Sequence, residues 1–249
     1  MTPLRRIALT AVAAPLALAL AACGSDEQAA EGPPTGEPIA HVAPPAGTSW
    51  AETATVTPED GYRIGNPDAP LKLVEYASHT CPACAAFSVG GAAKLDEYVE
   101  KGIVSYEIRN QIHNSIDLAL AMLMRCGEPS AFHPLANQVW ANLPAVMTRA
   151  QQDQAALDAA AQVPEAQRYQ AIAEAAGLLD FFAARGVSRD QAMQCLANTA
   201  QAQQIAENSQ TQSEELNVTG TPTFFLNGRT IDGITWAEIE PALQNAGAR

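Results

Sequence analysis

The segment at residues 71–87, LKLVEYASHTCPACAAF, constrains the fold of this chain more than any other. Residues 71–76 form an apolar run of β-favouring residues, and residues 77–80 form a short polar turn. The small residues that follow, Cys81-Pro82-Ala83-Cys84, predict the start of a helix. A strand that leads into a helix opening with Cys-x-x-Cys is typical of a thiol–disulfide redox centre.

The position of the two cysteines has a physical reason. At a helix N-terminus, unpaired N–H groups and the positive end of the helix dipole favour the thiolate of Cys81. The spacing puts Cys84 one turn deeper, close enough to form a disulfide, and Pro82 suits an early helical position because its missing N–H needs no partner there. Haem attachment would need His where Ala85 stands, and a zinc site would need two more ligands at suitable spacing.

The first 22 residues are predicted to be a targeting segment. Arg5 and Arg6 precede an apolar run at 7–19 that is too short to span a membrane. Leu20-Ala21-Ala22-Cys23 resembles the lipobox of bacterial lipoproteins, in which the cysteine is lipidated, and an ordinary secretory signal is the alternative. Both predict export to an oxidising compartment, and the lipobox predicts a periplasm-facing protein of the cell envelope that is lipid-anchored to a membrane.

The remainder of the chain predicts an α/β protein. Residues 23–58, rich in Gly, Pro, Ala, Glu and Thr, are expected to be a disordered tether. Strands are expected at 71–76, 103–108, 223–226 and 229–231, and helices at 81–101 and 236–245. The first strand, helix and second strand predict a βαβ unit with parallel pairing. Residues 115–215 predict helices only, at 116–126, 131–143, 151–161, 165–184 and 189–216, with breaks that include Pro144. The net charge of −13, without a basic cluster, argues against nucleic-acid binding.

A second motif, Gly220-Thr221-Pro222-Thr223-Phe224-Phe225, lies near the C-terminus. A Thr-Pro pair before an apolar strand is the pattern of the cis-proline loop of thioredoxin folds. With Cys-Pro-x-Cys, a helical insertion and the hairpin after it, the chain resembles the bacterial DsbA-like thiol–disulfide oxidoreductases. The resemblance implies a thioredoxin fold with an inserted helical domain. Residues 59–114 and 216–249 would form the thioredoxin-like domain, and residues 115–215 the insertion.

The resemblance also implies roles for individual residues. Cys81 matches the exposed nucleophilic cysteine, and Cys84 matches the buried resolving cysteine. Pro222 matches the cis-proline that faces the disulfide, and the Thr221 backbone would pair with an extended peptide substrate. Glu75 matches a buried acid that could relay a proton to or from the second thiol. The alternative for Glu75 is an edge-strand carboxylate that faces water.

One departure from the family concerns redox tuning. The best-known oxidases of the family carry His after the proline of the motif, whereas here Pro82 is followed by Ala83. The two residues between the cysteines tune the thiolate, so losing an imidazole should make the disulfide less oxidising. His79 could substitute in part, but the interpretation favoured here is an exposed turn residue.

Cys126 and Cys195 both lie in predicted helices of the insertion. Some members of the family have a second disulfide there, so the resemblance implies a structural disulfide between these two residues. Two buried free thiols are the alternative. His113 and His133 have no partners at metal-like spacing and are interpreted as structural or surface residues.

The sequence as a whole predicts a membrane-tethered, exported oxidoreductase that oxidises protein thiols to disulfides. It would need no metal and no organic cofactor. Its partners would be unfolded or reduced exported proteins, and a redox partner that resets Cys81 and Cys84. One alternative is a disulfide reductase or isomerase of the same fold, which Ala83 keeps open. Another is a non-catalytic binding or chaperone lipoprotein on a thioredoxin scaffold.

Overall fold

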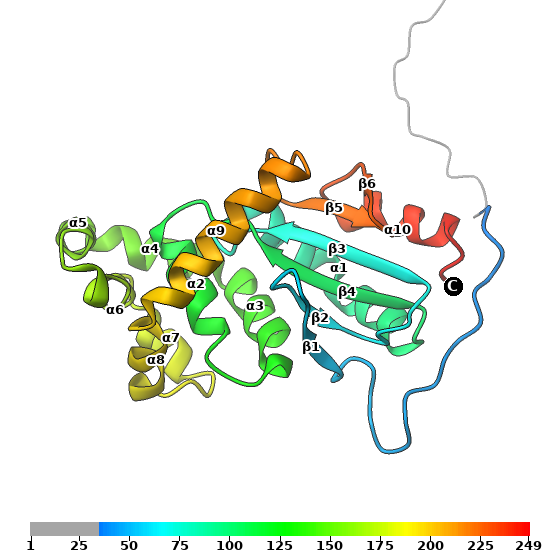
Figure 1. Ribbon diagram of the computed structural model, residues 1–249, viewed down its shortest axis with the longest axis horizontal. Helices are drawn as coiled ribbons and strands as arrows, with labels where there is room; N and C mark the ends of the chain where they lie inside the picture. Colours follow the sequence, from blue (N-terminus) through cyan, green and yellow to red (C-terminus); the bar gives the residue numbers. More distant parts are fainter. Residues whose placement is uncertain (1–34) are drawn as a thin grey trace, which may run out of the picture. The chain divides into compact units, whose positions relative to one another are not determined.

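The computed structural model describes residues 35–249 (Figure 1). The predicted targeting segment at residues 1–22, the predicted lipid site Cys23 and the first part of the predicted tether lie outside the described residues. Within the part that is described, no helix is both long and apolar enough to span a bilayer.

The strands of residues 35–249 form one mixed sheet. They are β1 (Ala54–Val56), β2 (Tyr62–Ile64), β3 (Leu71–Ala77), β4 (Val104–Asn110), β5 (Thr223–Leu226) and β6 (Arg229–Ile231), in the order β1-β2-β4-β3-β5-β6. The central strand β3 pairs parallel with β4 and antiparallel with β5. Helix α1 (Pro82–Glu100) connects β3 to β4, so the predicted βαβ unit is confirmed.

Alternation along β3 divides the core into two faces. The odd-numbered residues of β3 are all buried, and their face packs against α1 and α10 (Trp236–Asn245). Phe87 of α1 contacts Phe224 of β5 at a ring-centroid distance of 4.5 Å. Helix α10 approaches α1 closely at Gly91, where an added Cβ would lie 2.8 Å from the Trp236 side chain. The active-site helix is therefore fixed against the sheet by aromatic packing.

The segment between β4 and β5 is helical, as predicted (Figure 1). It contains α2 (Ser115–Met124), α3 (Phe132–Ala141), α4 (Leu143–Gln152), α5 (Gln154–Ala161), α6 (Glu165–Ala175), α7 (Leu178–Ala183), α8 (Arg189–Leu196) and α9 (Thr199–Glu215), with a 3-10 turn at Pro129–Ala131. The helices predicted at residues 165–184 and 189–216 are each divided in two, into α6 and α7 and into α8 and α9. Gly177 has a φ of +71° between α6 and α7, and Asn198 caps the N-terminus of α9. Pro144, predicted as a break, lies in the first turn of α4.

Residues 35–58 have mostly exposed side chains but are attached to the domain by hydrogen bonds and by the buried Trp50, which corrects the prediction of a disordered tether for this part. The Ile39 amide donates to the Gly247 carbonyl at 3.0 Å, and the Val42 amide donates to the Lys101 carbonyl at 2.9 Å. Trp50 is buried, and its indole N–H donates to the Val42 carbonyl at 2.7 Å. The segment has few residues that can form a core, and the buried Trp50 indole, with its N–H hydrogen-bonded, is the large apolar group that attaches it to the domain.

Replacing Trp50 with Ala should therefore destabilise the whole domain. Losing a buried tryptophan costs about 3–5 kcal/mol of unfolding free energy, which urea denaturation would measure. The exposed Val89→Ala on α1 is the control and should change stability by less than about 0.5 kcal/mol. Equal stabilities of the Trp50 variant and the wild type would mean that the segment is not part of the folded unit.

Candidate active site

Cys81 occupies the N-cap of α1, and Pro82 follows in the first turn. The Cys81 sulfur accepts a hydrogen bond from the Cys84 amide at 3.5 Å and lies 3.3 Å from the carbonyl oxygen of Thr221. The Thr221–Pro222 peptide bond is cis. Hydrogen bonding from the Cys84 thiol is the main cause that lowers the pKa of Cys81 to about 5, with contacts to Thr221 and the Ala83 and Cys84 backbone adding to it against the effect of burial.

Cys81 is only 8% exposed, so it is buried and not the exposed cysteine that the sequence predicted, and Cys84 lies one turn deeper with no exposed surface. Burial raises the pKa of the Cys84 thiol far above its ordinary value, and hydrogen bonding to Cys81 and the charge of Glu75 raise it further. Both cysteines are free thiols in this structure. Cys81 is therefore disposed to be a thiolate and Cys84 a thiol.

Glu75 lies in the central strand β3 and is completely buried, so it is not the edge-strand carboxylate of the alternative. The Tyr106 hydroxyl donates a hydrogen bond to Glu75 Oε2, while Oε1 has no partner among the described residues. Burial raises the pKa of Glu75 to about 8, against the lowering effect of the Tyr106 hydrogen bond, and the charge of Cys81 adds to the rise. Near neutral pH this carboxyl can both hold and release a proton.

His79 is fully buried, so the expectation of an exposed turn residue is wrong. Its ring stacks on Trp140 at 5.1 Å and contacts the Asn110 amide at 3.3 Å through Nδ1. Burial lowers the pKa of His79 to about 3, with the charges of Arg125 and His133 adding to the effect. The imidazole is neutral at neutral pH, and its 3.8 Å approach to Asp117 is therefore not an ion pair. It supplies no positive charge to Cys81.

Asp117 joins the loop before Cys81 to the insertion. It lies in the first turn of α2 and is fully buried, and its carboxylate accepts hydrogen bonds from the Ser78 hydroxyl at 2.6 Å and the amides of His79 and His113 at 2.8 and 2.9 Å. Burial raises the pKa of Asp117, and these hydrogen bonds oppose the rise. The carboxylate is stabilised by donors from two loops, so α2 holds the redox loop in place.

His113 lies at the cis-proline loop. Its Nε2 is 3.3 Å from the Thr221 hydroxyl and 3.0 Å from the side-chain oxygen of Gln111. Gln111 in turn donates to the Val218 carbonyl at 3.3 Å. On the other side, the Asn114 side chain donates to the Thr80 hydroxyl at 3.0 Å, so the loop that follows β4 contacts both the cis-proline segment and the loop before Cys81. His133, by contrast, is buried, and its Nε2–H donates to the Tyr62 carbonyl at 2.8 Å.

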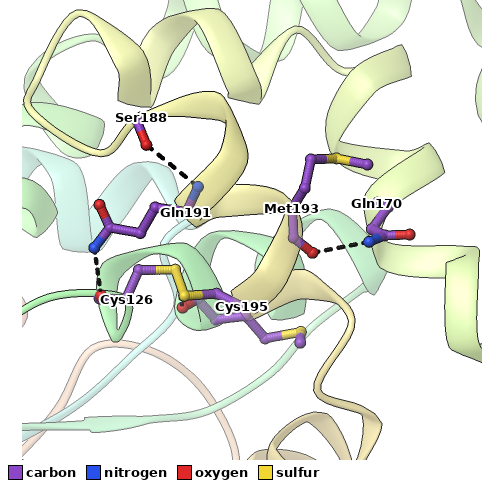
Figure 2. The surroundings of a disulfide bond; sticks show 7 residues. Cys126, Gln170, Ser188, Gln191, Met193 and Cys195 are labelled. Atoms are coloured by element: carbon purple, nitrogen blue, oxygen red, sulfur yellow. Dashed lines mark hydrogen bonds between the residues drawn. A yellow bond between two sulfur atoms is a disulfide. The ribbon is translucent and has the colours of Figure 1, made fainter.

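Cys126 and Cys195 are joined by a disulfide with a Cα–Cα distance of 5.8 Å (Figure 2). The bond links the residue after the C-cap of α2 to α8, across a sequence separation of 69 residues. The Gln191 side chain donates to the Cys126 carbonyl at 2.7 Å, and the Gln170 side chain donates to the Met193 carbonyl at 2.8 Å. In the chain-entropy account, closing such a loop contributes roughly 4 kcal/mol to stability.

The sequence interpretation missed Tyr106, Asp117 and the contact of His113 with Thr221. Asp117 carried a signal, because it is an acid in the otherwise apolar run of α2, and such an acid needs a buried partner. Tyr106 pairs with Leu73 in the parallel register next to Glu75, a relation that the sequence does not specify. Among residues 35–249, no group of three or more His, Cys, Asp or Glu side chains is arranged to hold a metal ion.

Comparison with known proteins agrees with the fold described above. The sequence profile of a family described as Thioredoxin matches residues 57–245, and the chain belongs to the thioredoxin family. A solved protein-disulfide isomerase from Novosphingobium aromaticivorans is 31% identical, with a TM-score of 0.69, over 74% of this chain and 95% of that one. Alpha-DsbA1 from Wolbachia pipientis is 21% identical, with a TM-score of 0.57, over 74% and 88% of the two chains. The thioredoxin-like fold with inserted helices is thus confirmed.

A relative in Rickettsia conorii, described as a "putative protein-disulfide oxidoreductase", is 28% identical over 185 residues, which are 74% of this chain and 59% of that protein. A relative with the same description in Rickettsia typhi is 26% identical over 186 residues, or 74% and 60% of the two proteins. The chain therefore matches only about six tenths of the length of these relatives.

The reduced protein should show one thiolate that titrates in the acid range. Thiolate absorbance against pH should give a midpoint near pH 5 for Cys81, and no second midpoint there, because burial raises the pKa of Cys84. Cys84→Ala should move the midpoint upward, because the main donor to the Cys81 sulfur is lost. A wild-type midpoint near the ordinary value of about 8.5 would contradict the assignment of Cys81 as the stabilised thiolate.

Proposed function

We propose that the protein is a thiol–disulfide oxidoreductase that oxidises the thiols of other proteins through Cys81 and Cys84. The observation that carries this proposal is the position of the two cysteines: Cys81 caps the N-terminus of α1 at 3.3 Å from the Thr221 carbonyl, before the cis Thr221–Pro222 bond, and Cys84 is buried one turn deeper. These surroundings displace the two thiol pKa values in opposite directions. An exchange-active pair needs one stable thiolate that a substrate can reach and one buried partner. Of the two residues, Cys81 is 8% exposed and Cys84 has no exposed surface, so a substrate would reach Cys81 first. The names of the oxidoreductase and isomerase relatives support the same class of reaction.

In the proposed reaction, the resting state is the Cys81–Cys84 disulfide. A substrate thiolate attacks the Cys81 sulfur, a mixed disulfide forms, and Cys84 leaves as a thiolate that takes a proton from Glu75. A second substrate thiolate attacks the substrate sulfur of the mixed disulfide, so that a substrate disulfide forms and Cys81 leaves as its stabilised thiolate. Two electrons pass from substrate to protein, and a redox partner must remove them.

The cis-proline loop would hold the substrate. Thr221, which precedes cis-Pro222, lies beside the Cys81 sulfur. An extended peptide that pairs with the Thr221 backbone would bring its own sulfur to the same place. This arrangement suits unfolded or reduced protein chains, because an extended backbone must be available for pairing.

Stabilisation of the Cys81 thiolate favours the oxidase direction. It stabilises the reduced form, and a stable reduced form makes the disulfide a better oxidant. A reductase or isomerase is the second candidate. It is supported by Ala83, which brings no imidazole to the thiolate, and by the 31% identical relative that is titled an isomerase.

The reduction potential, measured by equilibration with glutathione, separates the candidates. A potential near about −120 mV would support the oxidase, and one near about −270 mV would support a reductase. Cys81→Ser should abolish disulfide formation in a reduced, unfolded test protein. The control is His41→Ala, whose wild-type ring contacts the carbonyl of the C-terminal Arg249, and this variant should retain the activity. A wild type whose two thiols do not cycle would instead favour a non-catalytic binding protein.

We also infer that the protein is exported and lipid-anchored through Cys23, on the basis of Leu20-Ala21-Ala22-Cys23 and the charged and apolar residues before it. Expressed in bacteria, the wild type should accumulate in the membrane fraction and partition into detergent. Cys23→Ser should lose this property, because it has no thiol to acylate. If the wild type is released as a soluble periplasmic protein, the ordinary secretory signal is the better interpretation.

A further inference from the structure

A cavity of about 180 Å³ lies in the helical insertion, between α4 and the turn that joins α6 to α7 (Figure 1). Apart from Asn142, its polar side chains are two arginines, Arg149 of α4 and Arg185, which follows α7. The rest of the lining is Ala145, Val146, Ala176, Gly177, Leu178 and Phe181. No acidic side chain of the described residues lines the cavity, although the chain has a net charge of −13.

Arg185 is held in place while part of its guanidinium group has no partner. The guanidinium carbon lies 3.5 Å from the centroid of the Phe181 ring, and Nη1 donates to the Phe181 carbonyl at 2.8 Å. These two contacts fix the plane of the group before any ligand binds. The Nε–H of Arg185 is buried and has no acceptor among residues 35–249. A buried donor without an acceptor is costly, so this N–H favours a ligand that brings an oxygen to it.

Arg149 reaches the same cavity because the turn between α6 and α7 has no side chain at Gly177. An added Cβ at Gly177 would lie 2.9 Å from Arg149 Cγ and 3.2 Å from Arg149 Nε, so a larger residue would displace the arginine. The guanidinium group of Arg149 makes no hydrogen bond and no ion pair with another described residue. The glycine turn therefore brings a second cation, without a partner, to the cavity that Arg185 lines.

Three carboxylates on the adjacent elements are engaged elsewhere. Glu174 accepts a hydrogen bond from Arg189 at 2.6 Å, and Asp180 accepts one from Arg189 at 2.5 Å. Asp153, at the end of α4, accepts from the Ala156 amide at 3.1 Å and caps α5. The two cations that line the cavity repel each other, and no carboxylate of the described residues pairs with either of them. A bound anion would supply the missing negative charge.

We propose that this cavity binds a small carboxylate with an apolar body. The carboxylate accepts charge-assisted hydrogen bonds from both guanidinium groups, whose planar forks match its geometry. The apolar body lies on Val146, Leu178 and Phe181, which give the rest of the cavity an apolar lining. The cavity is smaller than the roughly 300 Å³ of the smallest common ligand pockets, so the ligand is small. No residue of the redox site lines the cavity, and the inference is independent of the proposed oxidoreductase function.

Benzoate is the probe, and isothermal titration calorimetry of the purified protein measures its binding. One equivalent should bind. Benzamide, which has no charge, and inorganic phosphate, which has no apolar body, should each bind about tenfold more weakly or less. Arg149→Gln should weaken benzoate binding about tenfold, because one charge-assisted pair is lost. Arg185→Lys should also weaken it, because an ammonium keeps the charge but not the planar fork.

Arg168→Gln is the matched control. Arg168 of α6 also has a buried Nε without a partner, but it does not line the cavity, so this variant should bind benzoate as the wild type does. Arg149 is exposed and its guanidinium has no partner, so Arg149→Gln should unfold at the wild-type temperature and a loss of binding would not reflect misfolding. A wild type that does not bind benzoate would overturn the site, and so would equal losses in the Arg149 and Arg168 variants. Phosphate or benzamide that binds as tightly as benzoate would overturn the assignment of an apolar carboxylate.

Discussion

The site depends on one close approach, the 3.3 Å distance between the Cys81 sulfur and the Thr221 carbonyl, whose residues are 140 positions apart in the chain. Antiparallel pairing of β5 with β3 brings them together, because Tyr76 lies opposite Thr223. This register puts the cis-proline loop at the end of β3 where α1 begins. The entire helical insertion lies between β4 and β5. The insertion must therefore end where β5 can pair with β3 in this register.

The insertion also contributes directly to the geometry at the centre. A carboxylate buried at the start of α2 is costly unless it is hydrogen-bonded, and Asp117 obtains its donors from the loops on both sides of the site. The same interactions that offset its burial fix the backbone two residues before Cys81. The disulfide between Cys126 and Cys195 fixes the other end of α2 to α8. Helix α2 is thus held at both ends, which makes it a rigid support for the redox loop.

Local patterns in the sequence predicted most of the strands and helices of the thioredoxin-like fold. The strand at residues 223–226, the Asn-Gly turn and the strand at 229–231 agree with the structure because alternation and turn chemistry are local signals. Glu75 could be identified as a candidate because it is an acid in an otherwise apolar strand. Its partner Tyr106 could not, because the two residues meet only through the register of β3 with β4. The errors have the same origin. His79 and Trp50 lie in polar or Pro-rich stretches, and each is buried against a residue distant in sequence, Trp140 and Gly102 respectively.

The absence of a charged imidazole near the motif need not abolish thiolate stabilisation. Cys81 and Cys84 are three residues apart, and their pKa values move in opposite directions because the helix gives them opposite surroundings. The N-terminal sulfur receives N–H and S–H donors, while the sulfur one turn deeper meets apolar packing and a carboxylate. The donors at Cys81 are all neutral, and the stabilisation comes first from the Cys84 thiol, then from the contact with Thr221 and from the backbone N–H groups at the start of α1. Disulfide formation removes that thiol donor and the thiolate together, so the stabilisation belongs to the reduced state alone, and this is the condition for an oxidising disulfide.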